Sequence, residues 1–310
     1  MLSRRSIRVK VMQSLFILNK DESLNKKQAV EFYDRSINET YQLYLFNLYA
    51  LIGICEFSLE DKGLRHSKYL PTDEDKAFSA KLYENELIQS LVDNPALQKV
   101  FAQNQFESKI DKDLLKRLYK MLASEDAYKR YLLEDSDRSS HLRILHELYR
   151  ICRRDEVFDE IMEDNFSAWA DDKSLVVGAV KKTLKGLPSD GEFFDEFYPD
   201  TETVDAFGKA LLNKVMQDEE YLMSLIDPVL ENWDAERVAL VDMLFIKMAI
   251  CEFLNFVTIP TKVTLNEYVE LSKEYSTEKS KDFINGVLDK LMRLMNEEGL
   301  IKKEGRGLLA

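Results

Sequence analysis

Residues 252–290 read EFLNFVTIPTKVTLNEYVELSKEYSTEKSKDFINGVLDK, in which a proline, a polar turn and a helical apolar pattern follow one another. Pro260 has a fixed φ and keeps the residue before it out of the helical region, so a helix should begin just after it. The apolar spacing predicts two helices, over residues 265–275 and 280–297, separated by the turn STEKSK at 276–281.

Two residues of the FINGVLD segment call for a structural interpretation. Gly286 inside a helix costs about 1 kcal/mol relative to Ala, and we interpret it as a place of close backbone packing. For Asn285 we favour a structural hydrogen bond over contact with a ligand, because buried polar groups are normally satisfied.

The rest of the chain also has the composition of a helical protein. Its 310 residues include only 10 Gly and 6 Pro, and 45% are hydrophobic, which is enough to form a core. An all-α fold is therefore predicted. Further helices are expected over residues 4–19, 27–59, 74–89, 95–103, 111–122, 125–133, 139–151, 204–230 and 237–253, the last one capped by Asp234. Residues 63–75 should form a loop and the acidic stretch 189–203 a linker.

The N-terminal segment is basic although the chain carries a net charge of −13. In residues 4–19 the apolar side chains of Ile7, Val11, Leu15 and Leu18 recur at helical spacing and form one stripe. Arg4 and Arg8 lie near the start of this stripe, where a side chain can lean away from the bundle. The overall charge argues against a protein that coats nucleic acid indiscriminately, but this local group of cations could still contact phosphates.

Several classes of protein are disfavoured by the sequence. The three cysteines Cys55, Cys152 and Cys251 are far apart and form no CxxC pair, so neither disulfides nor a zinc site is expected, and a reducing cytoplasm fits. No signal peptide is recognised, and no apolar run reaches the length of about 18 residues that a membrane helix needs. We therefore expect a cytoplasmic protein that does not span a membrane.

The stretch 252–290 resembles the NusB family, whose members share IP-x-K-V-x-(L/I)-N-E followed, after a turn, by (F/Y)-(V/I)-N-G-V-L-D. The matching residues are Ile259, Pro260, Lys262, Val263, Leu265, Asn266 and Glu267, then Phe283, Ile284, Asn285, Gly286, Val287, Leu288 and Asp289. The resemblance continues upstream through WDAERVALVDMLFIKMAICEF, residues 233–253, and returns in SRRSIRVKVMQSLF at the N-terminus.

The resemblance implies two small helical bundles interrupted by a large insertion. The first bundle would combine residues 1–20 and 203–232, and the second would comprise 233–297, followed by a tail at 298–310. Residues 21–202 would form a helical insertion after the first helix, because members of the family are usually far shorter. This insertion could hold a further partner surface or a self-association surface.

The function implied by the resemblance is transcription antitermination in rRNA synthesis, by binding boxA-type single-stranded RNA together with the ribosomal protein NusE. Arg4, Arg5 and Arg8 would contact phosphates, and Tyr275 and Phe283 would stack on bases, although Phe283 could equally be a core ring. Lys279 stands where an acid is frequent in the family, so it should raise affinity and lower selectivity. NusE would bind the helix carrying Asp242, Phe245, Lys247 and Ala249, where an acidic surface suits a basic protein.

Three alternatives remain at this stage. An enzyme is disfavoured, because His66, His141 and His146 form no metal site and no nucleophile, P-loop or dinucleotide motif is present; no cofactor or metal is expected. NusB-like domains also precede RNA cytosine methyltransferases, but few residues follow 297 and no glycine-rich turn is present, so we expect no such catalytic domain. The third alternative is a helical protein-protein scaffold that has lost RNA binding.

Overall fold

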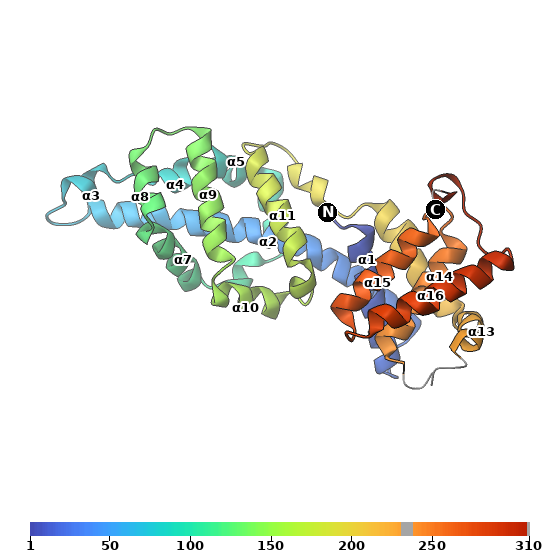
Figure 1. Ribbon diagram of the computed structural model, residues 1–310. Coiled ribbons are helices and arrows are strands. Elements are labelled where there is room, and N and C mark those ends of the chain that lie inside the picture. Colours follow the sequence, from blue (N-terminus) through green and yellow to red (C-terminus); the bar gives the residue numbers. More distant parts are fainter. Residues whose placement is uncertain (231–237, 309–310) are drawn as a thin grey trace. The chain divides into compact units, whose positions relative to one another are not determined.

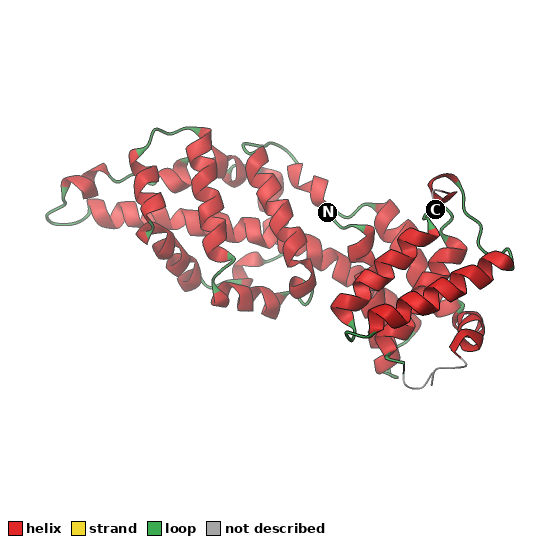
Figure 2. Cartoon of the chain, viewed as in Figure 1, coloured by secondary structure: helices red, strands yellow, loops and turns green. Residues whose placement is uncertain are grey.

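The computed structural model describes residues 1–230 and 238–308 (Figure 1). Helices form nearly all of the regular structure, and no strand occurs in these two ranges (Figure 2). The predicted all-α class is therefore confirmed. The predicted cap Asp234 and the first residue of the predicted helix 237–253 lie outside the described residues.

The chain divides into two compact units. Unit 1 comprises residues 38–198 together with Met1, and unit 2 comprises residues 2–37 and 199–310. The long helix α2 (Lys26–His66) contributes its first residues to unit 2 and the remainder to unit 1. The domain borders at 21 and 202 that the family resemblance implies stay a prediction.

Unit 1 is built around the middle of α2, which is buried on all sides and supplies Tyr44, Phe46 and Leu48 to the core. The other elements of unit 1 are α3 (Asp73–Ala77), α4 (Lys81–Glu84), α5 (Glu86–Val92), α6 (Pro95–Gln103), η1 (Phe106–Lys109), α7 (Lys112–Ser124), α8 (Asp126–Leu133), α9 (Arg138–Cys152), α10 (Glu156–Asn165), α11 (Trp169–Gly186) and η2 (Phe193–Phe197). Helix α2 is long and apolar enough to cross a membrane, but 61% of that apolar window is buried inside the fold, which accounts for its composition.

Unit 2 contains the N-terminal helix and all helices after residue 199. These are α1 (Arg4–Lys20), the π-helix η3 (Glu202–Lys209), α12 (Ala210–Gln217), α13 (Glu219–Leu230), α14 (Leu240–Asn255), α15 (Thr261–Tyr275), α16 (Ser280–Glu297) and the short 3-10 helix η5 (Gly305–Leu308). The predicted helices 95–103 and 280–297 have the observed bounds, and Pro260 stands directly before α15 as expected.

Two predictions about the local structure of unit 1 are wrong. The expected helix 74–89 is broken into α3, α4 and α5, because Asn85 caps a new helix by accepting hydrogen bonds from the backbone of Leu87 and Ile88. The expected linker 189–203 is packed up to Tyr198, because Phe194 and Phe197 are buried in the core of unit 1. Helices α10 and α11 also occupy residues for which no helix is predicted.

The expected single helix 204–230 is likewise divided into η3, α12 and α13. Gly208 in η3 lies where α1 and α2 approach it: an added Cβ would stand 2.0 Å from Tyr33 Oη and 2.4 Å from Ile7 Cγ2. Only glycine fits this approach, and the Tyr33 hydroxyl donates a hydrogen bond to the Val204 carbonyl at 2.8 Å. The hydrogen bond joins α2 to η3, and the close approach of Ile7 to Gly208 packs α1 against η3.

Candidate nucleic-acid interface

Helix α14 is the central element of unit 2, since it packs against α1, α12, α13, α15 and α16. Its side chains are apolar on all sides, as expected for a helix surrounded by others. Phe245 and Ala249 are fully buried, and Lys247 is 6% exposed and paired with Glu219 of α13. Asp242 is 5% exposed and accepts a hydrogen bond from Ser280 Oγ at 2.7 Å.

The sequence-based expectation that Asp242, Phe245, Lys247 and Ala249 form an exposed protein-binding surface is therefore wrong. These residues hold the unit together, and a partner cannot reach them while unit 2 is folded. The dense apolar pattern of residues 240–253 already indicated a core helix and outweighs the resemblance at this point.

Arg8 lies in a buried network instead of leaning away from the bundle. Its side chain donates from Nε to Glu252 Oε1 at 2.7 Å and from Nη2 to Oε2 at 2.8 Å, and both residues are at most 2% exposed. Burial alone would lower the pKa of Arg8, but the carboxylate of Glu252 outweighs that effect and raises it. Arg8 is therefore a permanently charged internal partner of α14.

Two hydroxyl groups of α15 complete the hydrogen bonding of Glu252. Tyr268 donates to Oε1 at 2.5 Å, and Thr264 donates to Oε2 at 3.2 Å. Burial, followed by the nearby charge of Glu252, raises the pKa of Tyr268 well above its usual value. The network joins α1, α14 and α15, and sequence reasoning missed Glu252 because an isolated Glu in an apolar stretch gives no indication of its partner.

The remaining arginines of the N-terminal group form ion pairs at the surface. Arg4 Nη2 lies 3.7 Å from Glu202, and Arg5 Nη2 lies 3.0 Å from Glu274. The arginine side chains are 45% and 35% exposed, so these pairs contribute little stability and other anions can compete for the arginines. The basic N-terminal group predicted from sequence is thus largely neutralised by acids from η3 and α15.

The turn between α15 and α16 gathers the other residues predicted to contact RNA. Tyr275 ends α15 and is half-buried, Lys279 directly precedes α16 and is exposed, and Phe283 in the first turn of α16 is half-buried. The turn is fixed from inside, because Ser280 accepts from the Thr277 backbone N–H at 3.2 Å and donates to buried Asp242. Ser280 is a positioning residue that sequence reasoning missed.

A cavity of about 570 Å³ opens beside this turn. Its lining includes Lys279 before α16, Val229 of α13, and Asp282, Phe283, Gly286 and Lys290 of α16. The ring of Phe283 is thus half-buried, neither enclosed in the core nor fully exposed to solvent. An added Cβ at Gly286 would meet nothing within 4 Å, so the prediction of close backbone packing at Gly286 is wrong. Asn285 is exposed, which removes the argument for a buried structural hydrogen bond at that residue.

The chemistry of a metal or thiol site is not seen in the residues that the structure describes. No group of three or more His, Cys, Asp or Glu side chains is placed to hold a metal ion within residues 1–230 and 238–308. The three cysteines are buried, and burial raises the pKa of Cys251 to about 12, so its thiol stays protonated. The α15–α16 turn presents the half-buried rings of Tyr275 and Phe283 and the exposed ammonium group of Lys279, with the exposed carboxylates of Glu278 and Asp282 beside them.

Comparison with known proteins supports the resemblance noted in the sequence. The sequence profile described as the NusB family matches residues 188–293. Proteins named transcription antitermination protein NusB align with part of the chain: that of Salinibacter ruber is 34% identical over 103 residues, that of Chloroherpeton thalassium 36% over 99, and that of Natranaerobius thermophilus 39% over 100.

These alignments cover about a third of this chain, namely 33%, 32% and 32%, and 64%, 47% and 67% of the respective relatives. The aligned part of the chain thus spans less than two thirds of the length of the first two relatives. The whole chain is longer than its relatives. The described residues form an all-helical protein whose unit 2 carries a turn with two half-buried aromatic rings and exposed Lys279. The chain belongs to the NusB family.

Proposed function

We propose that the protein is a transcription antitermination factor of rRNA synthesis, which binds boxA-type single-stranded RNA together with the ribosomal protein NusE in the cytoplasm. The observation that carries this proposal is the α15–α16 turn, where Lys279 and the half-buried rings of Tyr275 and Phe283 lie beside an open cavity. The names of the relatives supply the biological context.

The physical chemistry of the turn suits a single strand of RNA. Aromatic rings provide stacking faces worth about 1–3 kcal/mol per base, and an ammonium group provides a phosphate contact. Lys279 also stands at the N-terminus of α16, where unpaired backbone N–H groups favour an anion. A phosphate contact carries no base information, so Lys279 should strengthen binding more than it sharpens selectivity.

Arg4 and Arg5 supply the second half of the proposed RNA surface. Their ion pairs with Glu202 and Glu274 are exposed and weak, so phosphates can take the place of these carboxylates. Arg8 acts differently, because its charge is used by Glu252 inside the fold. We assign Arg8 the role of positioning α1.

The NusE contact must lie outside the buried face of α14. An overall charge of −13 suits association with a basic ribosomal protein, since complementary charges speed and orient encounter. The exposed acids of η3 and α13, Glu202 and Glu220 among them, are accessible to such a partner.

A filter-binding assay with a boxA-like RNA, with and without NusE, tests the proposal. Lys279→Asp should weaken binding but increase discrimination against a scrambled RNA, and Phe283→Ala should weaken binding about tenfold through lost stacking. Lys262→Asp makes the same charge change at the other end of α15 and should have little effect. Equal losses for Lys279→Asp and Lys262→Asp would contradict a specific contact at the turn.

A second candidate function is a protein-protein scaffold with the NusB fold that has lost RNA binding. It is favoured by the internal pairing of Arg8 and by the partial neutralisation of Arg4 and Arg5. The same assay separates the two functions, because a scaffold would bind neither boxA-like nor scrambled RNA in the presence of NusE.

A further inference from the structure

Unit 1 has a groove on the surface of α2 that is separate from the proposed RNA surface. It lies between the middle of α2 and the segment in which η1 leads into α7, and its volume is about 230 Å³. We call it the α2–α7 groove and define it by its apolar floor, Tyr49, Phe57 and Leu115, and its acidic rim, Glu56, Glu60 and Glu107.

Gly53 of α2 lets Leu115 of α7 pack directly on the helix backbone, since a Cβ added there would lie 3.0 Å from Leu115 Cδ1. Gly53 and Leu115 both line the groove. The floor is held rigidly from below, because the Tyr49 ring packs against Phe101 and Phe106 with centroids 5.4 and 5.9 Å apart. The groove is therefore preformed and apolar at its base.

The rim of the groove is acidic and only partly neutralised. Glu60 pairs with Lys116 at 3.2 Å, whereas Glu56 and Glu107 are exposed and form no ion pair with the described residues. Burial, followed by the charges of Glu107 and Glu56, raises the pKa of Tyr49, so both carboxylates act on the hydroxyl at the floor. Lys112 also lines the groove, and the three carboxylates outnumber it, so the site favours a ligand that carries positive charge.

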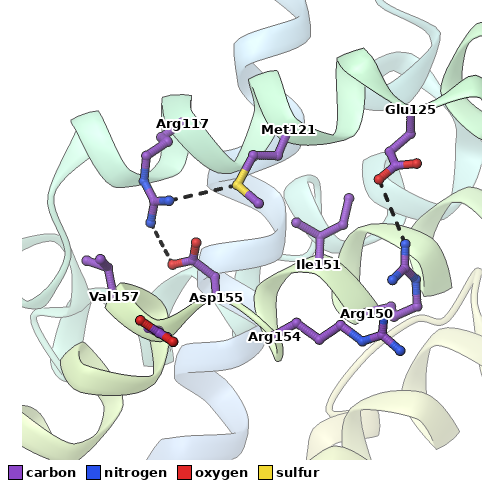
Figure 3. A pocket seen from close by; sticks show the side chains of 9 residues that line it. Arg117, Met121, Glu125, Arg150, Ile151, Arg154, Asp155 and Val157 are labelled. Atoms are coloured by element: carbon purple, nitrogen blue, oxygen red, sulfur yellow. Dashed lines mark hydrogen bonds and ion pairs between the residues drawn. The ribbon is translucent and has the colours of Figure 1, made fainter.

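A larger hollow in the same unit shows the opposite arrangement. Between α7 and the α9–α10 junction, Arg117 lies 2.6 Å from Asp155, and Arg150 lies 4.0 Å from Glu125 (Figure 3). Arg150 also pairs with Glu147. Three arginines and three acidic side chains line this hollow, so it has no clear preference for the charge of a ligand. The lining of the α2–α7 groove, by contrast, has more carboxylates than ammonium groups.

We propose that the α2–α7 groove is a docking site for a basic amphipathic segment of a partner protein. One apolar side chain of the partner enters the groove beside Tyr49 and Phe57, and Lys or Arg residues on either side of it face Glu56 and Glu107. The volume is below the range of about 300–1,000 Å³ that is usual for small-molecule sites, and it suits a single anchoring side chain. An acidic rim repels nucleic acid, which leaves a basic protein segment as the occupant.

The full-length protein can be tested with a fluorescently labelled helical peptide made of Leu and Lys. Glu56→Lys combined with Glu107→Lys should weaken peptide binding, measured by anisotropy, by about tenfold or more, because both rim charges reverse. Glu160→Lys combined with Glu163→Lys is the matched control, since it makes the same charge change at exposed positions of α10 and should change affinity less than about twofold.

Two further variants test the apolar part while leaving the charges unchanged. Gly53→Phe pushes Leu115 out of its place in the floor, and Phe57→Gln removes part of that floor, so either variant gives a readout if the other fails to fold. Each should weaken binding about fivefold at constant salt, which we attribute to loss of the buried anchor. Losses of equal size in both charge-reversal pairs, or unchanged affinity in the folded groove variants, would overturn the proposal.

Discussion

The two cationic regions of unit 2 have the same charge but opposite surroundings. Arg8 of α1 is 2% exposed and bound to Glu252 through two hydrogen bonds, whereas Lys279 at the α15–α16 turn is exposed beside an open cavity. In the sequence both are cations near predicted helix ends. The comparison teaches that a basic group in a sequence becomes a surface for anions only if the fold does not bury it against an acid.

The largest expected effect concerns the buried side of this comparison. Arg8→Met should lower the free energy of unfolding by about 3–5 kcal/mol, because it leaves the Glu252 carboxylate buried without a counterion. Urea denaturation followed by circular dichroism measures the loss.

The control variant also removes the charge of Glu252, which Arg8→Met leaves buried without a counterion. Arg8→Met combined with Glu252→Gln should recover part of the loss, since one of the hydroxyls of Tyr268 and Thr264 can still donate to the amide oxygen and the other can accept from the amide NH2. Unchanged stability in the single variant would mean that Arg8 is not a structural residue, and it would restore Arg8 to the RNA surface.

A pair of glycines provides the next test, with one glycine beside each region. Gly208→Ala should destabilise the protein by about 1–3 kcal/mol, because the new methyl group would overlap Tyr33 and Ile7 where α1 is fixed. Gly286→Ala near Lys279 meets open space and should stabilise α16 by up to about 1 kcal/mol. Thermal unfolding of both variants is the measurement, and a destabilising Gly286→Ala would show that the cavity is filled in solution.

A smaller effect is expected for the exposed arginines of α1. If Arg4 and Arg5 each contact one phosphate, Arg4→Ala combined with Arg5→Ala should flatten the salt dependence of RNA binding by about 1.4 in the log-log slope. Lys302→Ala combined with Arg306→Ala removes two exposed cations elsewhere and should leave the slope unchanged. Equal slopes for the wild type and the Arg4, Arg5 variant would confine the RNA surface to the turn.

The smallest expected effect is a pH dependence of stability at Lys303, which donates to the carbonyls of Glu252 and Phe256. Burial lowers the pKa of Lys303 to about 8, and the charge of Glu252 only partly opposes this. The unfolded chain therefore binds more protons above pH 8, so stability should rise with pH between about 8 and 10.5.

Because the group is half-exposed, this rise should stay below about 1 kcal/mol. Urea midpoints of the wild type and Lys303→Met, compared over that pH range, measure it. A rise of the same size in both proteins would assign it to other groups.

Local patterns in the sequence predicted much of the fold. Helical periodicity and strong caps act within a few residues, which is why α1, α6 and α16 were found with nearly their observed bounds. The helix expected over 74–89 was wrong because Asn85 can be either a helical residue or a cap, and packing of the buried residues around it decides between the two.

By itself, the sequence determined the all-α class, the position of the α15–α16 turn and membership of the NusB family, since each rests on residues that are close together in the chain. Only the tertiary structure decided which charges are exposed. Arg8 and Glu252 are 244 residues apart, and Asp242 is 38 residues from Ser280. Pairings over such distances depend on how the helices pack, and no local pattern of apolar and polar residues specifies them.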